Sequence, residues 1–323
     1  MNPTVDKLIL APMEGVADAL MRDLLTSINC FDLCITEFVR VVDQKLPAHV
    51  FKRISPELNN QGYTPAGTPV RVQLLGQDPN WLAENALTAI ALGSHGVDLN
   101  FGCPAKTVNK SKGGAVLLKT PEQIYRIIST VKSALGSQTL SAKIRLGFDS
   151  TELFDEIVDA VLAGGADQLT IHARTKADGY RPPAHWEWIA RVKEKVSLPI
   201  IANGDIFTVA DYHQCRDISG CEDVMIGRGV IFKPDLVRNI RADQAGIEVD
   251  PMPWTQLQPL VLKFYQSMMG QVAPRYIGGR LKQWFNFLRE TYPEALELFQ
   301  SIKVMRDPEA IEKMLLIDNN QHH

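Results

Sequence analysis

Short apolar runs punctuate the chain between Leu8 and Ile226, and stretches with helical spacing separate most of them. Apolar runs bounded by turn residues are typical of buried parallel strands, whereas apolar positions three and four residues apart are typical of amphipathic helices. The predicted strands are Leu8–Met13, Leu33–Glu37, Val70–Leu75, Gly96–Asn100, Ser141–Leu146, Gln168–His172, Pro199–Asn203 and Asp223–Ile226. The predicted helices are Trp81–Leu92, Pro121–Leu135, Ser150–Ala163, Trp186–Lys195 and Val209–Ile218.

Predicted strands and helices alternate in this part of the chain, and the number of strands is sufficient for a closed barrel. Eight such strands in succession predict an α/β fold, a parallel (β/α)8 TIM barrel. The alternative is an open, doubly wound sheet. The Gly-x-Gly-x-x-Gly turn that usually follows the first strand of such a sheet is absent here.

The pattern changes after Ile240. Gly246, Pro251 and Pro253 mark a linker. Beyond it the apolar spacing is helical, as in the stripe formed by Leu281, Trp284, Phe285 and Leu288. We therefore expect a barrel domain at residues 1–243 and a small C-terminal helical domain at residues 250–318.

Within several predicted strands, polar residues occupy every second position. These residues are Arg71 and Gln73, Asp98 and Asn100, Lys143 and Arg145, and Thr170, His172 and Arg174, with Glu37 and Asn203 at two further strand ends. Side chains alternate along a strand, so one set faces the barrel interior. A barrel core tolerates few polar groups without partners, and the pattern therefore indicates a polar ligand site. The alternative is that these side chains lie in solvent above the core and have no role.

Two glycine-bearing turns follow the last two predicted strands. They are Ala202-Asn203-Gly204-Asp205 and Ile226-Gly227-Arg228-Gly229. Loops at these places in a TIM barrel commonly bind phosphate through backbone N–H groups, and Arg228 adds a charged donor. The alternative is that the glycines merely relieve tight turns. A phosphate site without a dinucleotide motif favours a mononucleotide cofactor or a phosphorylated substrate.

An inward-facing lysine narrows that choice. Lys143 needs an anionic partner to stay charged, and a reduced flavin is anionic on one ring edge. Gln73 and Asn100 can hydrogen-bond an imide edge, and the turn Ala11-Pro12-Met13 places a soft side chain suited to lie beneath a flat ring. Together these features predict a flavin mononucleotide (FMN) pocket.

Cys103 directly follows the fourth predicted strand, in Asn100-Phe101-Gly102-Cys103-Pro104. A thiol is mostly protonated at neutral pH and can therefore act as a general acid. Reduction of a pyrimidine C5–C6 bond needs such a proton beside a flavin hydride. The alternative is a small buried apolar side chain, which is the interpretation for the remaining cysteines, Cys30, Cys34, Cys215 and Cys221.

Composition and charge limit the other possibilities. Five cysteines at irregular spacing predict neither a disulfide framework nor a metal site, and we expect a reducing, cytoplasmic location. No apolar run has the length of a membrane span, and the polar start Met1–Lys7 does not look like a signal peptide. The net charge is −3, yet residues 251–306 carry seven lysines and arginines against three glutamates. This asymmetry indicates a face that binds a polyanion.

The motifs around Cys103 resemble those of the tRNA-dihydrouridine synthase family. The strongest stretch is Val97-Asp98-Leu99-Asn100-Phe101-Gly102-Cys103-Pro104, followed by Lys106, Val108 and Gly114-Ala115. Further matches are Ala11-Pro12-Met13-Glu14-Gly15, Lys143-Ile144-Arg145, His172-Ala173-Arg174-Thr175, Asn203-Gly204-Asp205 and Gly227-Arg228. They occur in order over essentially the whole predicted barrel. Cys34 to Gln44 and Gly279 to Arg289 are most similar to the bacterial C-type branch.

The resemblance implies FMN as cofactor, NADPH as reductant and Cys103 as proton donor, with the D-loop uridine at position 16 of tRNA as target. The implied FMN-binding residues are Pro12, Met13, Gln73, Lys143, His172, Asn203, Gly204, Asp205, Gly227 and Arg228. The implied tRNA-binding residues are Arg40, Asn100, Arg280, Lys282 and Lys303. No metal, membrane or obligate protein partner is expected.

Two other functions remain open from the residues themselves. A small-molecule pyrimidine reductase, similar to dihydroorotate dehydrogenase, explains an FMN pocket but leaves the basic helical region without a role. A non-catalytic tRNA-binding protein leaves Cys103, Lys143 and His172 without one. The alternative for the basic side chains of the helical region is an ordinary solvated surface.

Overall fold

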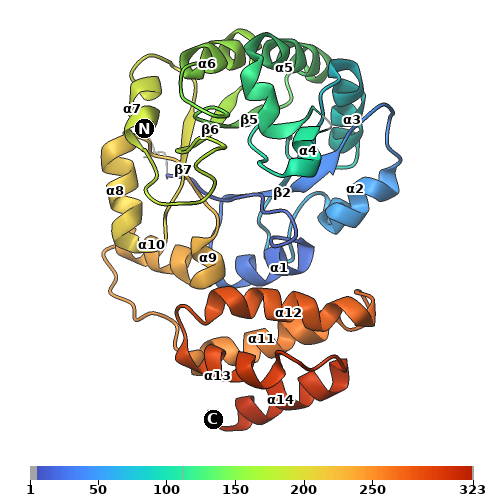
Figure 1. The fold of residues 1–323 in the computed structure, drawn as a ribbon, viewed down its shortest axis with the longest axis vertical. Helices are drawn as coiled ribbons and strands as arrows, with labels where there is room; N and C mark the ends of the chain where they lie inside the picture. The colour runs from blue at the N-terminus through green and yellow to red at the C-terminus, as the bar shows by residue number, and fades with distance from the viewer. Residues whose placement is uncertain (1–5, 111, 322–323) are drawn as a thin grey trace. The chain divides into compact units, whose positions relative to one another are not determined.

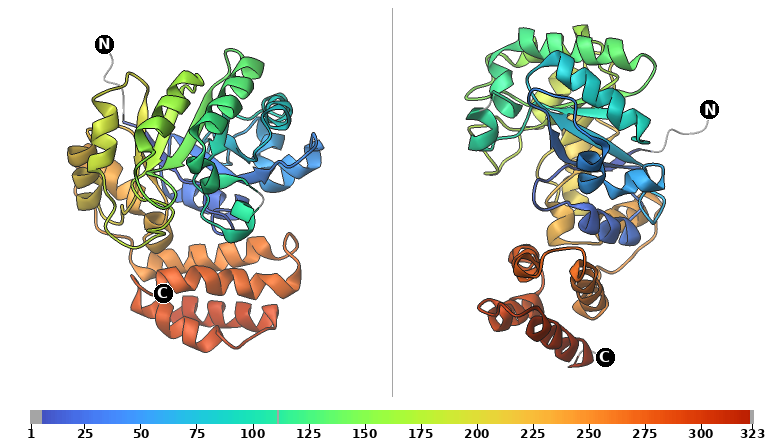
Figure 2. Two further views of the ribbon diagram at one scale, coloured as in Figure 1. Left: turned by 45° about the horizontal axis from the view of Figure 1, so that its top comes forward. Right: turned by 90° about the vertical axis from the view of Figure 1, so that its right-hand side faces the viewer.

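The computed structural model describes residues 6–110 and 112–321, and in this part of the chain eight parallel strands close into a barrel (Figures 1 and 2). Neighbours in sequence are neighbours in the sheet, and β1 pairs with β8 to close it. The strands are β1 (Leu8–Leu10), β2 (Leu33–Arg40), β3 (Val70–Leu75), β4 (Val97–Asn100), β5 (Leu140–Arg145), β6 (Gln168–His172), β7 (Ile200–Asn203) and β8 (Val224–Ile226). The TIM-barrel prediction is confirmed.

Helices follow most of the strands. They are α1 (Ala19–Ile28), α2 (Ala48–Ile54), α3 (Pro79–Ala91), α4 (Lys106–Lys110), α5 (Pro121–Leu135), α6 (Phe154–Ala163), α7 (Glu187–Lys193), α8 (Val209–Ser219), α9 (Gly229–Phe232) and α10 (Leu236–Gln244), with 3-10 turns η1 (Pro56–Asn60) and η2 (Gly114–Lys119). All five predicted helices are present. The helix expected from Ser150 begins only at Phe154, and α1 and α2 were not predicted.

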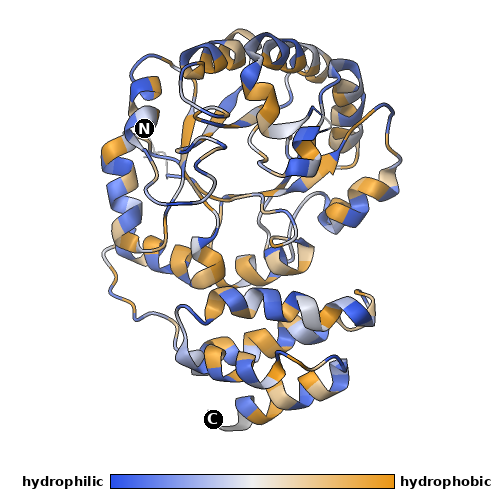
Figure 3. Cartoon of the chain, viewed as in Figure 1, coloured by the Kyte–Doolittle hydropathy of each residue, from blue (hydrophilic) through white to orange (hydrophobic). Residues whose placement is uncertain are grey.

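The outer face of the sheet packs on amphipathic helices. Helix α5 buries Ile124, Ile127, Ile128 and Val131, which recur at helical spacing. Figure 3 shows the resulting division of these outer helices into apolar and polar faces. Burial of such a stripe against strand side chains supplies most of the stability of a helix in a barrel.

Two strand ends differ from the prediction. The first strand ends at Leu10 rather than Met13, because the Met13 carbonyl accepts from Val16 and Ala17 N–H and the chain turns there. Pro12 also lacks an N–H for the ladder. The second strand continues past Glu37 to Arg40 through an irregularity between Ile35 and Phe38.

One half of the barrel interior is apolar. Residues paired across neighbouring parallel strands point to the same side of the sheet, and the register joins Ile9 to Leu33 on one side and to Met225 on the other. The apolar cluster inside the barrel consists of Ile9, Ala11, Leu33, Ile35, Ile201 and Met225, all buried. The strands β1, β2, β7 and β8 therefore provide a dry half of the core.

Contacts divide the chain into two compact units. The first comprises residues 1–19, 31–206 and 210–227, and the second comprises residues 20–30, 207–209 and 228–323. The second unit contains α1, α9 and α10 together with α11 (Trp254–Met268), α12 (Pro274–Leu288), α13 (Pro293–Ile302) and α14 (Pro308–Gln321). The division into domains 1–243 and 250–318 stays a prediction.

The second unit has its own apolar core. The predicted stripe Leu281, Trp284, Phe285 and Leu288 is buried on α12. Within this unit the Trp284 indole N–H donates to the Ile231 carbonyl at 3.1 Å. Among residues 6–110 and 112–321, no helix combines the length and apolar character that crossing a membrane requires. Residues 1–5 of the polar N-terminal stretch lie outside the described residues.

Candidate functional site

The other half of the barrel interior is polar, and its side chains are bonded to one another. Gln73 Nε2 donates to Asp98 Oδ2 at 2.7 Å, and Ser141 Oγ donates to Asp98 Oδ1 at 2.5 Å. Arg71 Nη1 donates to Ser141 Oγ at 3.0 Å and to Gln168 Oε1 at 2.8 Å. Strands β3 to β6 contribute all of these groups. The alternative that the alternating polar residues lie in solvent is wrong for these strands.

Burial raises the pKa of the Asp98 carboxyl above its ordinary value, and several neighbours oppose the shift. Hydrogen bonds from Ser141 and Gln73 and the positive charges of Arg71 and Lys143 favour the carboxylate. A buried carboxyl with this many donors is part of a satisfied network rather than an isolated charge.

The network reaches the turn that carries Cys103. Asn100 Nδ2 donates to Gln73 Oε1 at 2.7 Å, while Asn100 Oδ1 accepts from the backbone N–H groups of Gly102 and Cys103, each at 2.9 Å. The Cys103 carbonyl accepts from Ala115 N–H at 3.1 Å. Backbone bonds on both sides of Cys103 therefore fix its position at the C-terminal end of β4.

The Cys103 thiol is suited to hold a proton. Its side chain is partly buried, and burial raises its pKa, opposed by a backbone hydrogen bond from Ala105 and the charge of Arg145 and reinforced by Glu14. A raised pKa keeps the thiol protonated at neutral pH, as general acid catalysis requires. The same shift makes Cys103 a poor nucleophile, because the thiolate is the nucleophilic form.

The burial of the other four cysteines agrees with the prediction except at Cys30. Cys34, Cys215 and Cys221 are buried, as expected for small apolar side chains. The interpretation is wrong for Cys30, which is exposed. It lies in the connection between α1 and β2, outside any strand or helix, so no periodic pattern predicts its burial.

Lys143 lies on β5 inside the barrel, where its Nζ donates to Asn203 Oδ1 at 3.0 Å. Burial and, to a smaller extent, the charge of Arg145 lower the pKa of Lys143, Asp98 opposes them, and the resulting pKa is about 7. An amine with this pKa gains a proton readily when an anion binds beside it. The position is therefore suited to an anionic ligand.

The C-terminal ends of β6 and β7 carry His172 and Asn203, and a glycine turn follows each of β7 and β8. His172 is buried at the end of β6 and pairs in register with Asn203. Asn203 Nδ2 donates to the Met225 carbonyl at 2.8 Å. Gly204 has a φ of 133°, a conformation open to glycine and few other residues.

The turn after β7 is held by buried groups. Asp205 pairs with the Arg174 guanidinium, which is fully buried, and Trp186 Nε1 donates to the Gly204 carbonyl at 3.0 Å. Directly after β8, Gly227 lies near the turn that follows β1, since an added Cβ would be 3.6 Å from the Met13 sulfur. Arg228 belongs to the second unit, where its guanidinium lies 5.6 Å from the Phe207 ring centroid.

Arg145, predicted only as an inward-facing polar residue without a specific role, connects two loops of the barrel. Its Nε donates to the Gly102 carbonyl at 2.8 Å, and its Nη1 donates to the carbonyls of Thr175 and Gly179 at 3.1 and 3.0 Å. Its guanidinium lies 5.3 Å from the Tyr180 ring centroid. The strand alternation places Arg145 inside the barrel, but only the folded loops show what it binds.

The predicted tRNA-binding residues occur in both units. Arg40 is exposed at the end of β2 and Asn100 lies in the network of the first unit. In the second unit Arg280 donates to Gln283 Oε1 at 3.1 Å, Lys282 donates to the Met305 carbonyl, and Lys303 donates to Gln300 Oε1. Burial, reinforced by Arg306, lowers the pKa of Lys282.

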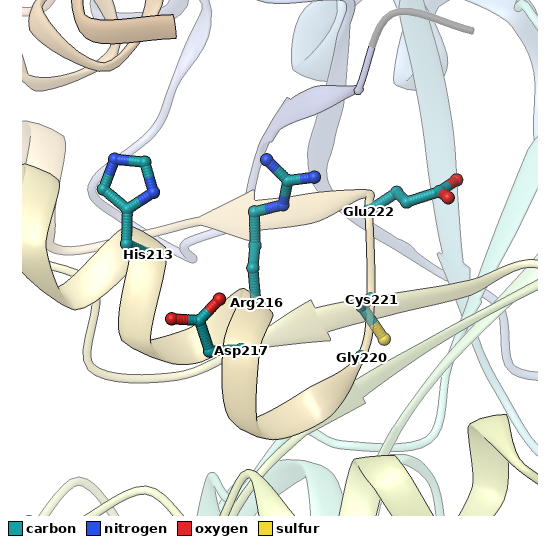
Figure 4. A pocket seen from close by; sticks show the side chains of 6 residues that line it. All are labelled: His213, Arg216, Asp217, Gly220, Cys221 and Glu222. Carbon is teal, nitrogen blue, oxygen red and sulfur yellow. The ribbon is translucent and has the colours of Figure 1, made fainter.

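A surface pocket lies elsewhere on the barrel. It is lined by His213, Arg216, Asp217, Gly220, Cys221 and Glu222 (Figure 4). These residues precede β8, so the pocket lies at the N-terminal ends of the strands, away from the catalytic end of a TIM barrel. Arg216 is paired with Asp6 at 2.7 Å. Among residues 6–110 and 112–321, no group of three or more histidines, cysteines and carboxylates could hold a metal ion.

The fold resembles that of a solved structure with low sequence identity to this chain. The structure of histamine dehydrogenase from Rhizobium sp. 4-9 superposes with a TM-score of 0.54 at 12% sequence identity, covering 80% of this chain and 48% of that chain. Identity this low supports the barrel fold alone.

Curated relatives match over nearly the full length. A tRNA-dihydrouridine(16) synthase from Aquipseudomonas alcaligenes is 50% identical over 96% of this chain and 99% of its own length. The protein of that name from Shewanella oneidensis is 50% identical, covering 98% and 99%, and that from Haemophilus influenzae is 49% identical, covering 96% and 99%. The family model described as dihydrouridine synthase (Dus) matches residues 9–307. The chain therefore belongs to the dihydrouridine synthase family.

Proposed function

We propose that this enzyme reduces the uridine at position 16 in the D-loop of tRNA to 5,6-dihydrouridine. The observation that carries the proposal is the near full-length identity of about one half to relatives named tRNA-dihydrouridine(16) synthase. The barrel supports it independently, because a protonated thiol and a lysine with a lowered pKa occur at the C-terminal ends of neighbouring strands.

FMN is the proposed cofactor, and the residues proposed to bind it have suitable chemistry. Lys143 offers a proton-accepting amine for an anionic ring edge, and the backbone N–H groups of the turns at Gly204 and Gly227 would hold the phosphate. The proposed contacts are Pro12, Met13, Gln73, Lys143, His172, Asn203, Gly204, Asp205, Gly227 and Arg228. Once bound and reduced by NADPH, the flavin would supply the hydride.

Cys103 is the proposed general acid. Reduction of the C5–C6 bond adds one hydride and one proton, and the Cys103 thiol gives its proton to the carbon that does not receive the hydride. The resulting thiolate takes a proton from solvent before the next turnover. Because burial raises the pKa of the thiol, that step returns the side chain to its resting form.

A basic surface is the proposed tRNA contact. Arg280, Lys282 and Lys303 belong to the second unit, whose segment 251–306 carries the positive balance of the chain. Arg40 and Asn100 add contacts on the first unit. The target base must leave its stack to reach a site inside a barrel mouth, and phosphate contacts of this kind orient an RNA without reading its sequence. A cytoplasmic location follows from this substrate.

The decisive experiment combines the purified protein, FMN, NADPH and an unmodified tRNA transcript, with dihydrouridine measured by nucleoside mass spectrometry. We expect reduction of a transcript with uridine at position 16 and none when cytidine replaces it. Free uridine and orotate serve as controls. Their reduction in place of tRNA would favour a small-molecule pyrimidine reductase, and the absence of any reduction would favour a tRNA-binding protein without activity.

The tRNA surface is tested by charge removal. Arg280→Gln combined with Lys282→Gln should weaken tRNA binding about tenfold and reduce the salt dependence of log Kd by up to about 2. Lys195→Gln on the first unit is the matched control. Equal affinity and equal salt slopes for both proteins, measured by filter binding at several salt concentrations, would refute the assignment.

A further inference from the structure

Asp98 lies at the centre of the polar half of the barrel and contacts none of the groups proposed to react. It is 1% exposed on β4. Both carboxylate oxygens accept hydrogen bonds, from Ser141 Oγ on one side and from Gln73 Nε2 on the other. Asp98 is thus an acceptor at which two lines of hydrogen bonds meet.

The line from Gln73 ends at the catalytic turn. Because the Gln73 amide donates to Asp98, its carbonyl oxygen faces Asn100 and accepts from Asn100 Nδ2 at 2.7 Å. The oxygen of Asn100 therefore faces the backbone, where it accepts from Gly102 and Cys103 N–H. Each amide in this line has one orientation that satisfies its neighbours.

The line from Ser141 has the same property. Arginine has no acceptor atom, so the Ser141 hydroxyl accepts from Arg71 Nη1 and gives its own hydrogen to Asp98. This line ends at Gln168, which accepts from Arg71 at 2.8 Å, and at the His95 carbonyl, which accepts from Arg71 Nε at 2.9 Å. Among the described residues, these hydrogen bonds reach the Cys103 turn only through Asp98, so a change at Ser141 serves as an internal control.

We infer that Asp98 is a positioning residue for Cys103, acting through Gln73 and Asn100; the inference rests on the proposed function of Cys103. Asp98 fixes the Gln73 amide, Gln73 fixes the Asn100 amide, and Asn100 holds the two N–H groups that precede the thiol. Without an acceptor at position 98 the Gln73 amide rotates, and the Asn100 oxygen no longer faces the turn. Misplacement of a reacting group by about 1 Å costs up to about a hundredfold in rate.

The first test measures amide hydrogen exchange in the full-length protein, which does not depend on activity. Asp98→Leu should raise exchange at Gly102 and Cys103 at least about tenfold. Ser141→Ala removes the other bond to Asp98 and should leave exchange at these two amides within about twofold of wild type. In turnover assays at saturating FMN and tRNA, Asp98→Leu should lower kcat for dihydrouridine formation about tenfold.

The second test reverses one hydrogen bond of the line. Gln73→Glu places two acceptors against each other at Asp98, and we expect fast exchange at Cys103. Adding Asp98→Asn gives the carboxylate introduced at position 73 a donor, retains one negative charge in the network and leaves an acceptor oxygen facing Asn100. The double variant should exchange at least about tenfold more slowly at Cys103 than Gln73→Glu alone. This comparison also holds if Asp98→Leu does not fold.

Two results would overturn the inference. One is exchange and kcat in Asp98→Leu that match those of Ser141→Ala. The other is a double variant that exchanges as fast as Gln73→Glu. A wild-type protein that forms no dihydrouridine would instead overturn the proposed function, and the exchange measurements would still decide whether Asp98 holds the turn.

Discussion

The two halves of the barrel interior use opposite means to fill the same kind of space. On β1, β2, β7 and β8 the inward side chains form an apolar cluster that includes Ile9, Ile35 and Met225. On β3 to β6 they form a network of amides and charges centred on Asp98. Apolar packing tolerates small shifts, whereas a buried polar network loses stability as soon as one partner moves. The proposed reacting groups lie beside the polar half, where hydrogen bonds fix the orientation of each side chain.

The sharpest test of this comparison removes the Cys103 thiol, which lies in the turn after β4 and is held by the polar network. Cys103→Ala should lower dihydrouridine formation by at least about a hundredfold, because a general acid contributes about 10²–10⁴-fold. Flavin content and oxidation of NADPH by oxygen should be retained. Cys30→Ala, which changes an exposed thiol, is the matched control for spectrophotometric and mass-spectrometric assays. Full activity in Cys103→Ala would remove the proton-donor role.

Truncation in the apolar half should affect stability and leave the chemistry intact. Ile35 is 1% exposed, and Ile35→Ala should reduce the free energy of unfolding by about 2–5 kcal/mol. Ile35→Val should reduce it by only about 1 kcal/mol. Chemical denaturation measures both values. A loss of kcat in folded Ile35→Ala comparable with that of Cys103→Ala would show that the two halves do not divide stability and chemistry as described.

The polar half of the barrel should make stability depend on pH through Lys143, whereas the apolar half should not. The pKa of Lys143 is lowered from 10.5 to about 7, so between these values the unfolded chain binds a proton that the folded chain has released. Stability relative to Lys143→Met therefore rises with pH over this window, by up to about 1.4 kcal/mol per pH unit. Below pH 7 the cost of the buried charge is complete and the difference is constant.

Denaturation of the cofactor-free proteins at pH 7 and pH 9 tests this expectation. The wild type should gain stability relative to Lys143→Met on going to pH 9, and FMN binding at pH 8 should be accompanied by proton uptake. Met225→Leu, a change in the apolar half, should show no pH dependence relative to wild type. A Lys143→Met difference that is flat between pH 7 and pH 9 would contradict the lowered pKa.

The sequence predicts the apolar framework well because it depends on local periodicity. The spacing of apolar residues predicts all eight strands and five of the helices. The first strand ends earlier than predicted because the turn at Met13 competes with the ladder, and α1 is not among the predicted helices although Met21, Leu24 and Leu25 have helical spacing. Such errors concern element ends and short segments, where local signals are weakest.

The partners inside the polar half were not predictable in the same way. Alternation identifies Arg71, Asp98 and Arg145 as inward-facing, but the bonds from Arg71 to Gln168 and from Arg145 to Gly179 depend on the register between strands and on loop conformation. These contacts join residues that are remote in sequence. The assignments of FMN- and tRNA-binding residues came from the family resemblance, and they stay predictions.

Closure of the sheet has a consequence during synthesis. The first strand finds one of its two partners only when β8 has emerged, since Lys7 and Leu8 bond to Asp223 and Val224 across 216 residues. Until then β1 and the latest strand each present unpaired backbone, which is a template for association between chains. A nascent or truncated chain that stops before Val224 is therefore expected to aggregate, whereas the finished ring offers no edge to a neighbour.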